Sequence, residues 1–221
     1  MFENREEAGR RLVERLIRYR GDPTAIILAL PRGGVAIGYQ LSLGLHLPLD
    51  VFIARKLGAP DNPEYALGAV GETGTIYLNP DAMAAYGLSR SDLEEVVQVQ
   101  QREIMRRERL YRQGRSLPML TDRVVILVDD GIATGSTFFA SAKSIKHLKP
   151  RRLIGAIPVG PVETIREART QVDELVVLAT PDPFWAVGNH YVDFAQINDT
   201  DVVEYLKLAE EAMRERSQSS V

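Results

Sequence analysis

Two adjacent carboxylates, Asp129 and Asp130, follow a continuous apolar run over residues 124–128. Such a run is typical of a strand buried on both faces, and the acids stand where that strand ends. Two carboxylates in this place can accept hydrogen bonds from vicinal hydroxyls or approach a hard cation such as Mg²⁺. The pair is therefore a candidate site for a diol or a cation.

A turn of small residues comes next and leads into a helical pattern. It consists of Ala133, Thr134, Gly135, Ser136 and Thr137. Backbone N–H groups at the start of a helix, with the helix dipole behind them, bind a phosphate dianion, and the glycine lets the backbone approach closely. A diol-binding pair beside a phosphate-binding turn indicates a ribose 5-phosphate site. We expect it outside the carboxyl ends of the strands of an open α/β sheet.

This order of residue types resembles the signature of type I phosphoribosyltransferases. Nucleotide triphosphatases also have an apolar strand ending in two acids, but they need a Gly-x-x-x-x-Gly-Lys-Ser/Thr loop, which this chain lacks. Receiver domains carry paired acids near their start, whereas more than half of this chain precedes the pair. The resemblance implies 5-phosphoribosyl 1-pyrophosphate as substrate and Mg²⁺ as cofactor. Asp129 and Asp130 would bind the ribose and the metal, and residues 133–137 the 5′-phosphate.

A turn of Pro31, Arg32, Gly33 and Gly34 follows an earlier apolar run over residues 25–30. The two glycines let the backbone approach a ligand, although a tight strand-to-helix turn would also use them. The resemblance makes this turn the pyrophosphate loop. It also implies that the Pro31–Arg32 peptide is cis or otherwise strained.

Arg55 and Lys56 follow an expected strand over residues 49–54. Two cations at a strand end repel each other, which a bound polyanion would offset, and two solvated side chains that point apart are the alternative. The resemblance places both cations on the pyrophosphate and counts them, with the two acids, as catalytic. It further implies that the turn-rich segment 57–65 is a mobile loop that covers the substrate.

Residues 180–198 are similar to the hood of purine phosphoribosyltransferases. The resemblance implies that Trp185 stacks on the base, with Phe184 as the alternative. Asp193 matches an aspartate that approaches the metal and pyrophosphate. The competing interpretation is that Trp185 is an ordinary core residue.

Residues 80–118 are interpreted as a helical insertion, because many phosphoribosyltransferases connect the same two segments with much less chain. The pattern predicts a short helix over 80–86 and a long, charged helix over 92–113, with Ser89 or Ser91 as its cap. The chain is thus placed in a branch of the family that carries this insertion. A mostly solvated helix, a subunit contact and a lid all remain open as its role.

Strands and helices alternate along the rest of the chain, which predicts a single α/β domain over residues 1–221. Its mostly parallel sheet is flanked by helices, as in the type I phosphoribosyltransferase fold, and carries the small hood and the insertion. Strands are expected at 25–30, 49–54, 66–70, 75–78, 124–128, 153–158 and 174–179, and the other helices at 4–19, 35–43, 136–148, 162–171 and 199–214. Asn4 and either Asp199 or Thr200 are the expected caps of the first and last helices, and 216–221 is expected to be a frayed tail.

The chain has 221 residues, of which 45% are hydrophobic, and this suffices for one domain with a sizeable core. A formal charge of -3 gives no general reason to expect nucleic-acid binding. Cysteine is absent, so disulfides and thiolate chemistry are excluded. Because no long apolar run occurs, we expect a cytoplasmic protein with neither a membrane nor a nucleic-acid partner. We further expect a homo-oligomer, namely a dimer.

The resemblance implies a transferase in which a small nitrogen acceptor, such as a nucleobase, displaces pyrophosphate from the ribose. A regulatory protein that binds phosphoribosyl pyrophosphate without transferring it is the alternative on the same fold. Two departures from the family concern the acceptor. Ala133 stands where 6-oxopurine enzymes carry an aspartate, and residues 157–161 lack the lysine that such enzymes place after the next strand. Hypoxanthine and guanine are therefore expected to be poor acceptors, and an adenine-like base a better one.

Overall fold

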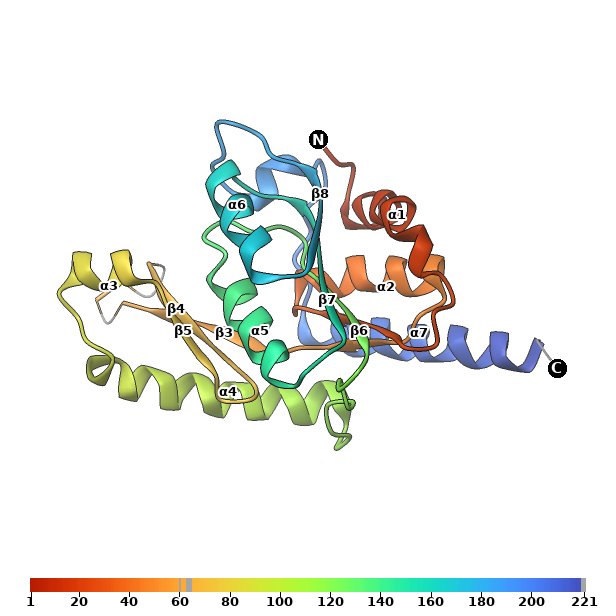
Figure 1. The fold of residues 1–221 in the computed structure, drawn as a ribbon, viewed down its shortest axis with the longest axis horizontal. Coiled ribbons are helices and arrows are strands. Elements are labelled where there is room, and N and C mark those ends of the chain that lie inside the picture. Colours follow the sequence, from red (N-terminus) through yellow and green to blue (C-terminus); the bar gives the residue numbers. More distant parts are fainter. Residues whose placement is uncertain (60, 63–64, 220–221) are drawn as a thin grey trace.

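The main sheet of the protein is parallel and lies at the centre of the molecule (Figure 1). The computed structural model describes residues 1–59, 61–62 and 65–219. The strand order is β2-β1-β6-β7-β8, with bounds Leu49–Val51 for β2, Ala25–Ala29 for β1, Val124–Val128 for β6, Arg152–Val159 for β7 and Glu174–Ala179 for β8. Strands β1 and β6 are in register, with Ala29 opposite Val128. The segments that follow these two strands therefore leave the sheet side by side.

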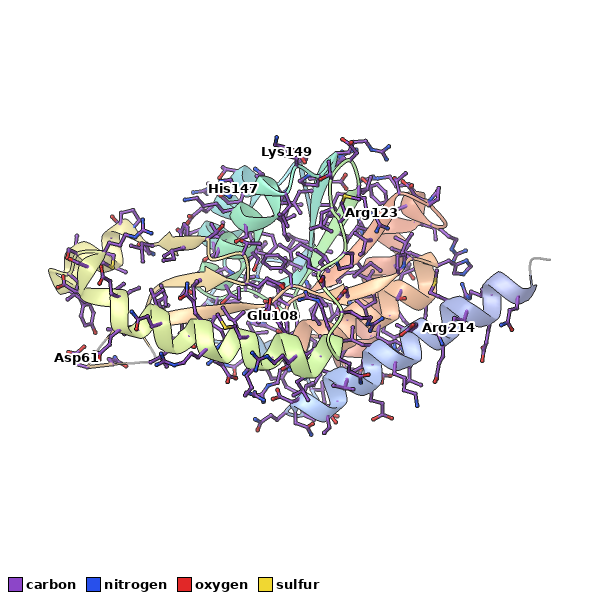
Figure 2. All side chains as sticks on the ribbon, turned by 90° about the horizontal axis from the view of Figure 1, so that it is seen from below. Asp61, Glu108, Arg123, His147, Lys149 and Arg214 are labelled. Carbon is purple, nitrogen blue, oxygen red and sulfur yellow. The ribbon has the colours of Figure 1, made fainter. Side chains whose placement is uncertain are left out.

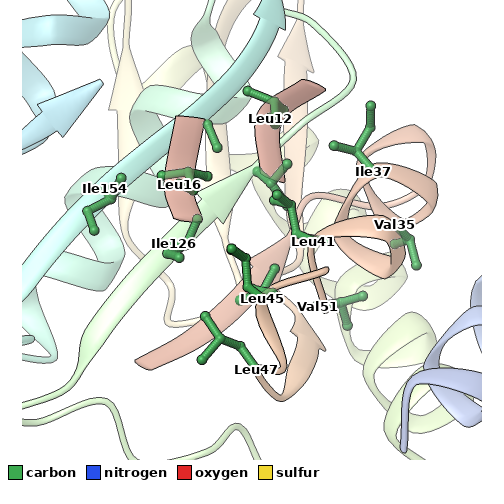
Figure 3. Close-up of a cluster of buried hydrophobic side chains, with 14 of the residues drawn as sticks. Leu12, Leu16, Val35, Ile37, Leu41, Leu45, Leu47, Val51, Ile126 and Ile154 are labelled. Atoms are coloured by element: carbon green, nitrogen blue, oxygen red, sulfur yellow. The ribbon is translucent and has the colours of Figure 1, made fainter. Parts of the chain in front are cut away.

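Helices cover both faces of this sheet, which explains why its central strands are apolar throughout. Helices α1 (Arg5–Leu16) and α2 (Gly33–Leu45) lie on one face, and α5 (Ser136–His147) and α6 (Val162–Gln171) on the other. Alternate residues of one strand enter opposite cores: Ile27 packs with the α1–α2 side, and Ile26 and Leu28 with the α5–α6 side. Figure 3 shows Leu12, Leu16, Leu41 and Leu45 gathered over Ile126 and Ile154. Burying each such side chain contributes about 1.5–3 kcal/mol.

A second, antiparallel sheet consists of β3 (Ala54–Gly58), β4 (Ala66–Gly71) and β5 (Ile76–Leu78). The expected hairpin between β4 and β5 is confirmed, but the expected strand over 49–54 is wrong. Its apolar run is shared between two sheets, because β2 ends at Val51 and the chain passes through buried Phe52 and Ile53 before β3 starts. Arg55 and Lys56 consequently lie inside β3, paired with Val70 and Ala69, and not at the end of a parallel strand.

The helical insertion contains α3 (Pro80–Tyr86), a 3₁₀ turn over Ser91–Leu93 and α4 (Glu94–Arg112), close to the bounds expected. Neither Ser89 nor Ser91 caps α4; the Ser89 hydroxyl donates to Asp92 instead. Figure 1 shows the small sheet between α4 and α5, and Figure 2, seen from below, shows α4 crossing over that sheet toward α7. One side of α4 is therefore covered, with Ile104, Arg107, Tyr111 and Arg112 buried.

The two terminal helices pack on α2. Asn4 caps α1 as expected, since its side chain accepts from the N–H of Glu7. At the start of α7 (Asp199–Ser219) the cap is Asn198, which accepts from the N–H of Asp201, and not Asp199 or Thr200. Helix α7 continues over residues 216–219, where a frayed tail was expected, and residues 220–221 lie outside the described part. Within the described residues, no helix combines the length and apolarity needed to cross a membrane.

Candidate functional site

The acidic pair and the glycine turn meet at the carboxyl edge of the main sheet. Asp129 and Asp130 follow β6, and Gly33 and Gly34 open α2 just after the neighbouring strand β1. A Cβ atom on Gly34 would lie 2.9 Å from the carbonyl oxygen of Val128, and one on Gly33 would overlap the carboxylate of Asp130. Only glycine therefore lets α2 begin against the acids. The Pro31–Arg32 peptide is cis, as expected.

Burial destabilises the negative charges of the two neighbouring acids. Asp129 Oδ1 accepts from the N–H of Asp130 at 2.8 Å, and Asp130 Oδ2 accepts from Arg5 Nε at 2.7 Å. Burial, followed by the charge of Asp130, raises the pKa of Asp129 well above its usual range. Burial also raises the pKa of Asp130, although Arg5 opposes that shift. Hydroxyl donors or a cation from a ligand would offset this cost.

Arg5 is a site residue that the sequence reasoning missed. Besides Asp130 it contacts the hood: its Nη1 donates to the carbonyl of Ala195 at 2.8 Å, and its guanidinium lies 3.8 Å from the centroid of the Phe194 ring. A signal was available, because a cation in the first turn of a helix opposes the helix dipole and is usually placed there for another reason. Arg5 thus ties α1 and the hood to the acidic pair.

Replacing Arg5 by methionine is expected to destabilise the protein. The side chain of Arg5 is only 10% exposed, so the change leaves a buried carboxylate without its cation and should lower the free energy of unfolding by about 2 kcal/mol. Urea denaturation measures this value. Arg10→Met is the matched control, because Arg10 is 58% exposed on the same helix and should change stability by less than about 0.5 kcal/mol. Equal losses in both variants would contradict the structural role of Arg5.

The turn expected to bind phosphate leads directly into α5. Gly135 has φ 74° and precedes the first residue of α5, a left-handed conformation that favours glycine. The carbonyl of Ala133 accepts from the Thr164 hydroxyl at 2.8 Å, and the Thr134 and Ser136 hydroxyl oxygens lie 3.3 Å apart. The first N–H groups of a helix have no partner within it, so those of α5 are available to an anion at this edge of the sheet.

Two of the cations expected at the pyrophosphate, Arg55 in β3 and Arg32 before α2, contact side chains of different helices. Arg55 Nε donates to Gln100 Oε1 on α4 at 2.9 Å, and Arg32 Nη1 lies 3.9 Å from Asp199 Oδ1 at the start of α7. Burial lowers the pKa of Arg55 and the positive charge of Arg107 lowers it further, while the Glu103 carboxylate opposes the shift and Arg32 adds to it. Arg55 is thus a half-buried cation hydrogen-bonded to a neutral amide, with both like charges and the Glu103 carboxylate nearby. A polyanion would stabilise this group.

The hood presents an aromatic surface to solvent. Trp185 is 80% exposed, so its interpretation as a core residue is wrong, while Phe184 is half-buried and stacks on His190 with ring centroids 4.9 Å apart. Both aromatic side chains line a pocket of about 370 Å³ that also contains Glu163 and Asp182. A flat ring could stack there within reach of carboxylate acceptors.

Asp193 is placed apart from the other two metal candidates. It is exposed, and its Oδ1 accepts from the N–H of Ala195 at 3.0 Å. Within the part of the chain that the structure describes, no group of three or more histidine, cysteine or acidic side chains is arranged to hold a metal ion. The structure therefore brings together Asp129 and Asp130 but does not join Asp193 to them.

The loop expected to cover the substrate is only partly described. Residues 60, 63 and 64 of the segment 57–65 lie outside the described residues. Leu57 and Gly58 belong to β3, so the connection starts later than expected. Ala59 is buried, and its N–H donates to the carbonyl of Tyr65 at 3.0 Å.

The site thus combines an acidic pair, the start of helix α5 and a glycine turn. Comparison with known proteins finds relatives of this chain. The family model described as "Phosphoribosyl transferase domain" matches residues 2–193. Two relatives from Mycobacterium tuberculosis, "Putative phosphoribosyl transferase Rv0571c" and "Putative phosphoribosyl transferase MT0597", are each 39% identical over 209 residues, or 95% of this chain. The chain spans 47% of the length of these relatives.

Two solved structures have a fold similar to that of this chain. TT1426 from Thermus thermophilus is 38% identical to this chain with a TM-score of 0.77, and the match covers 93% of this chain and 97% of TT1426. The AQ2163 protein from Aquifex aeolicus has 12% identity and a TM-score of 0.52, with 91% of this chain and 84% of its own covered. At that identity the second likeness concerns the fold alone.

Proposed function

The chain belongs to the phosphoribosyl transferase family, and we propose that it transfers the phosphoribosyl group of 5-phosphoribosyl 1-pyrophosphate to a nitrogen acceptor, releasing pyrophosphate. One observation carries the proposal. Strands β1 and β6 are paired in register, so the two glycines after β1 lie against the two acids after β6. The start of α5 also follows β6. Binding groups for a diol, a phosphate and a polyanion therefore share one edge of the sheet.

The residues fit a magnesium ion that is carried mainly by the substrate. Mg²⁺ usually keeps several waters and binds one or two protein carboxylates together with substrate phosphates. Asp129 and the second carboxylate oxygen of Asp130 would hold it, since Oδ2 of Asp130 already accepts from Arg5. When bound, the ion would neutralise charge on the departing pyrophosphate.

The side chains of this site suit a reaction through a cation-like ribose. The bond from C1 to the pyrophosphate oxygen breaks, a bond from C1 to the acceptor nitrogen forms, and the proton of the acceptor nitrogen passes to water. Arg32, Arg55 and Lys56 would stabilise the departing pyrophosphate. Asp129 and Asp130 would hold the ribose hydroxyls and favour the positive charge that develops on the ring. We propose that the connection after β3 excludes water while this happens.

The hood pocket favours an acceptor that donates hydrogen bonds. Its described lining contains the carboxylates Glu163 and Asp182 and no basic side chain. Carboxylates accept from exocyclic amino groups, whereas a 6-oxo group needs a donor. Ala133 offers no proton at the turn. We therefore propose an adenine-like or other amino-bearing ring, stacked on Trp185.

Binding of phosphoribosyl pyrophosphate tests this function. With Mg²⁺ and ligand at about 100 times the dissociation constant, we expect stabilisation by about 2.7 kcal/mol, because the ligand binds only the folded state. Differential scanning fluorimetry measures the rise in Tm, with ribose 1-phosphate at the same concentration as the control. An unchanged Tm at millimolar phosphoribosyl pyrophosphate would refute the proposed substrate.

A further inference from the structure

Helix α4 and strand β3 enclose a pocket of about 690 Å³. The strand contributes Arg55 and Lys56, and the helix contributes Gln98, Gln100 and Arg102. Glu95 is the acid among the described lining residues. Among these described residues, two guanidinium groups, Arg55 and Arg102, and two amides lie with a single carboxylate, and this combination suits an anion.

Gln100 orients one of the cations that line this pocket. Its Oε1 accepts from Arg55 Nε at 2.9 Å, so a neutral amide orients the guanidinium. The helix also reaches the second pyrophosphate candidate, Arg32, through Asp199. That carboxylate accepts from the Tyr111 hydroxyl at 2.7 Å and from Arg106 at 2.8 Å, and it lies 3.9 Å from Arg32 Nη1.

We propose that α4 forms the outer wall of the pyrophosphate half of the site, with Gln100 as a positioning residue for Arg55 and Arg102 as an additional cation for the pyrophosphate group. The inference rests on the proposed function and assigns a role to the helical insertion. In this arrangement the insertion contributes side chains to the site and is not a separate lid. It sets the affinity for the leaving group.

The decisive test compares three substitutions by calorimetry with inorganic pyrophosphate and Mg²⁺. Gln100→Leu removes one hydrogen bond to a charged group and should weaken pyrophosphate binding by roughly threefold to tenfold. Gln100→Glu keeps an acceptor for Arg55 but adds a negative charge, so it should weaken binding more than leucine does. A merely structural role predicts the reverse order, because glutamate would preserve the contact. Gln101→Leu, the same change at the next position of α4, should leave the affinity unchanged.

A second pair of variants tests the charge on the helix. Arg102→Gln should lower pyrophosphate affinity, while Arg109→Gln removes the same charge from the same helix outside this pocket and should have no effect. Ribose 5-phosphate should bind all five variants as it binds the unaltered protein, because it lacks the pyrophosphate group.

The outcomes separate this inference from the proposed function. Unaltered protein that binds phosphoribosyl pyrophosphate, combined with Gln100 and Arg102 variants of unchanged pyrophosphate affinity, overturns the role of α4 alone. Unaltered protein that binds neither phosphoribosyl pyrophosphate nor pyrophosphate overturns both. A selective loss of pyrophosphate affinity in the Gln100 and Arg102 variants, with both controls unchanged, supports the inference.

Discussion

Asp129→Asn combined with Asp130→Asn is expected to weaken phosphoribosyl pyrophosphate binding by at least about 100-fold, because each hydrogen bond to a charged group is worth about 1.5–3 kcal/mol. The chain should stay folded. Burial already raises the pKa of both acids, so removing their charges relieves a cost. Arg5 keeps its hydrogen bond to Ala195 and its contact with Phe194. Calorimetry gives the affinity, and circular dichroism verifies the fold.

The control for this prediction removes two acids elsewhere. Asp81→Asn with Asp122→Asn changes the net charge equally at exposed positions far from the carboxyl edge of the sheet. It should bind phosphoribosyl pyrophosphate like the unaltered protein. Unchanged binding by the Asp129 and Asp130 variant would mean that these acids do not bind the ribose hydroxyls.

The second large effect concerns the choice of acceptor. We expect guanine and hypoxanthine to react with kcat/KM values at least about 100-fold below that of the best base, because a buried polar group left without a partner is strongly penalised. Neither Ala133 nor the segment 157–161 supplies the donor that a 6-oxopurine needs, and Glu163 and Asp182 are acceptors. A kinetic panel of adenine, hypoxanthine, guanine and non-purine amines measures the ratio.

Trp185 offers a control that separates stacking from selectivity. Trp185→Ala should weaken every flat acceptor by about 1–3 kcal/mol without changing their ranking, because stacking accepts any π-face. The same residue is the sole tryptophan of the sequence, so its fluorescence reports acceptor binding directly. Guanine turnover that rivals the best base would show that the residues assigned to specificity are misplaced.

Local sequence patterns were sufficient for the part of the site built on single strand-to-turn units. The apolar run 124–128, the acids after it and the turn before α5 all lie in one stretch, so their arrangement follows from short-range geometry. The glycine turn after β1 was recognised in the same way. Its contact with the acids follows from the parallel pairing of two apolar strands.

Other features depend on tertiary contacts that no local pattern contains. The apolar run 49–54 gives no sign that it is divided between two sheets, because Phe52 and Ile53 are as buried as the strand residues beside them. Arg5 meets a carboxylate 125 positions away. At the start of α7, Asn198 competes with Asp199 and Thr200 as a cap, and all three are residue types that favour this position.

Pyrophosphate release in the presence of phosphoribosyl pyrophosphate, Mg²⁺ and a panel of nitrogen acceptors tests the central claim most directly. We predict that release depends on the acceptor, equals the amount of nucleotide formed, and disappears in the Asp129→Asn, Asp130→Asn variant. Tight binding of phosphoribosyl pyrophosphate without release for any acceptor would contradict transfer and leave a regulatory protein that senses this ligand.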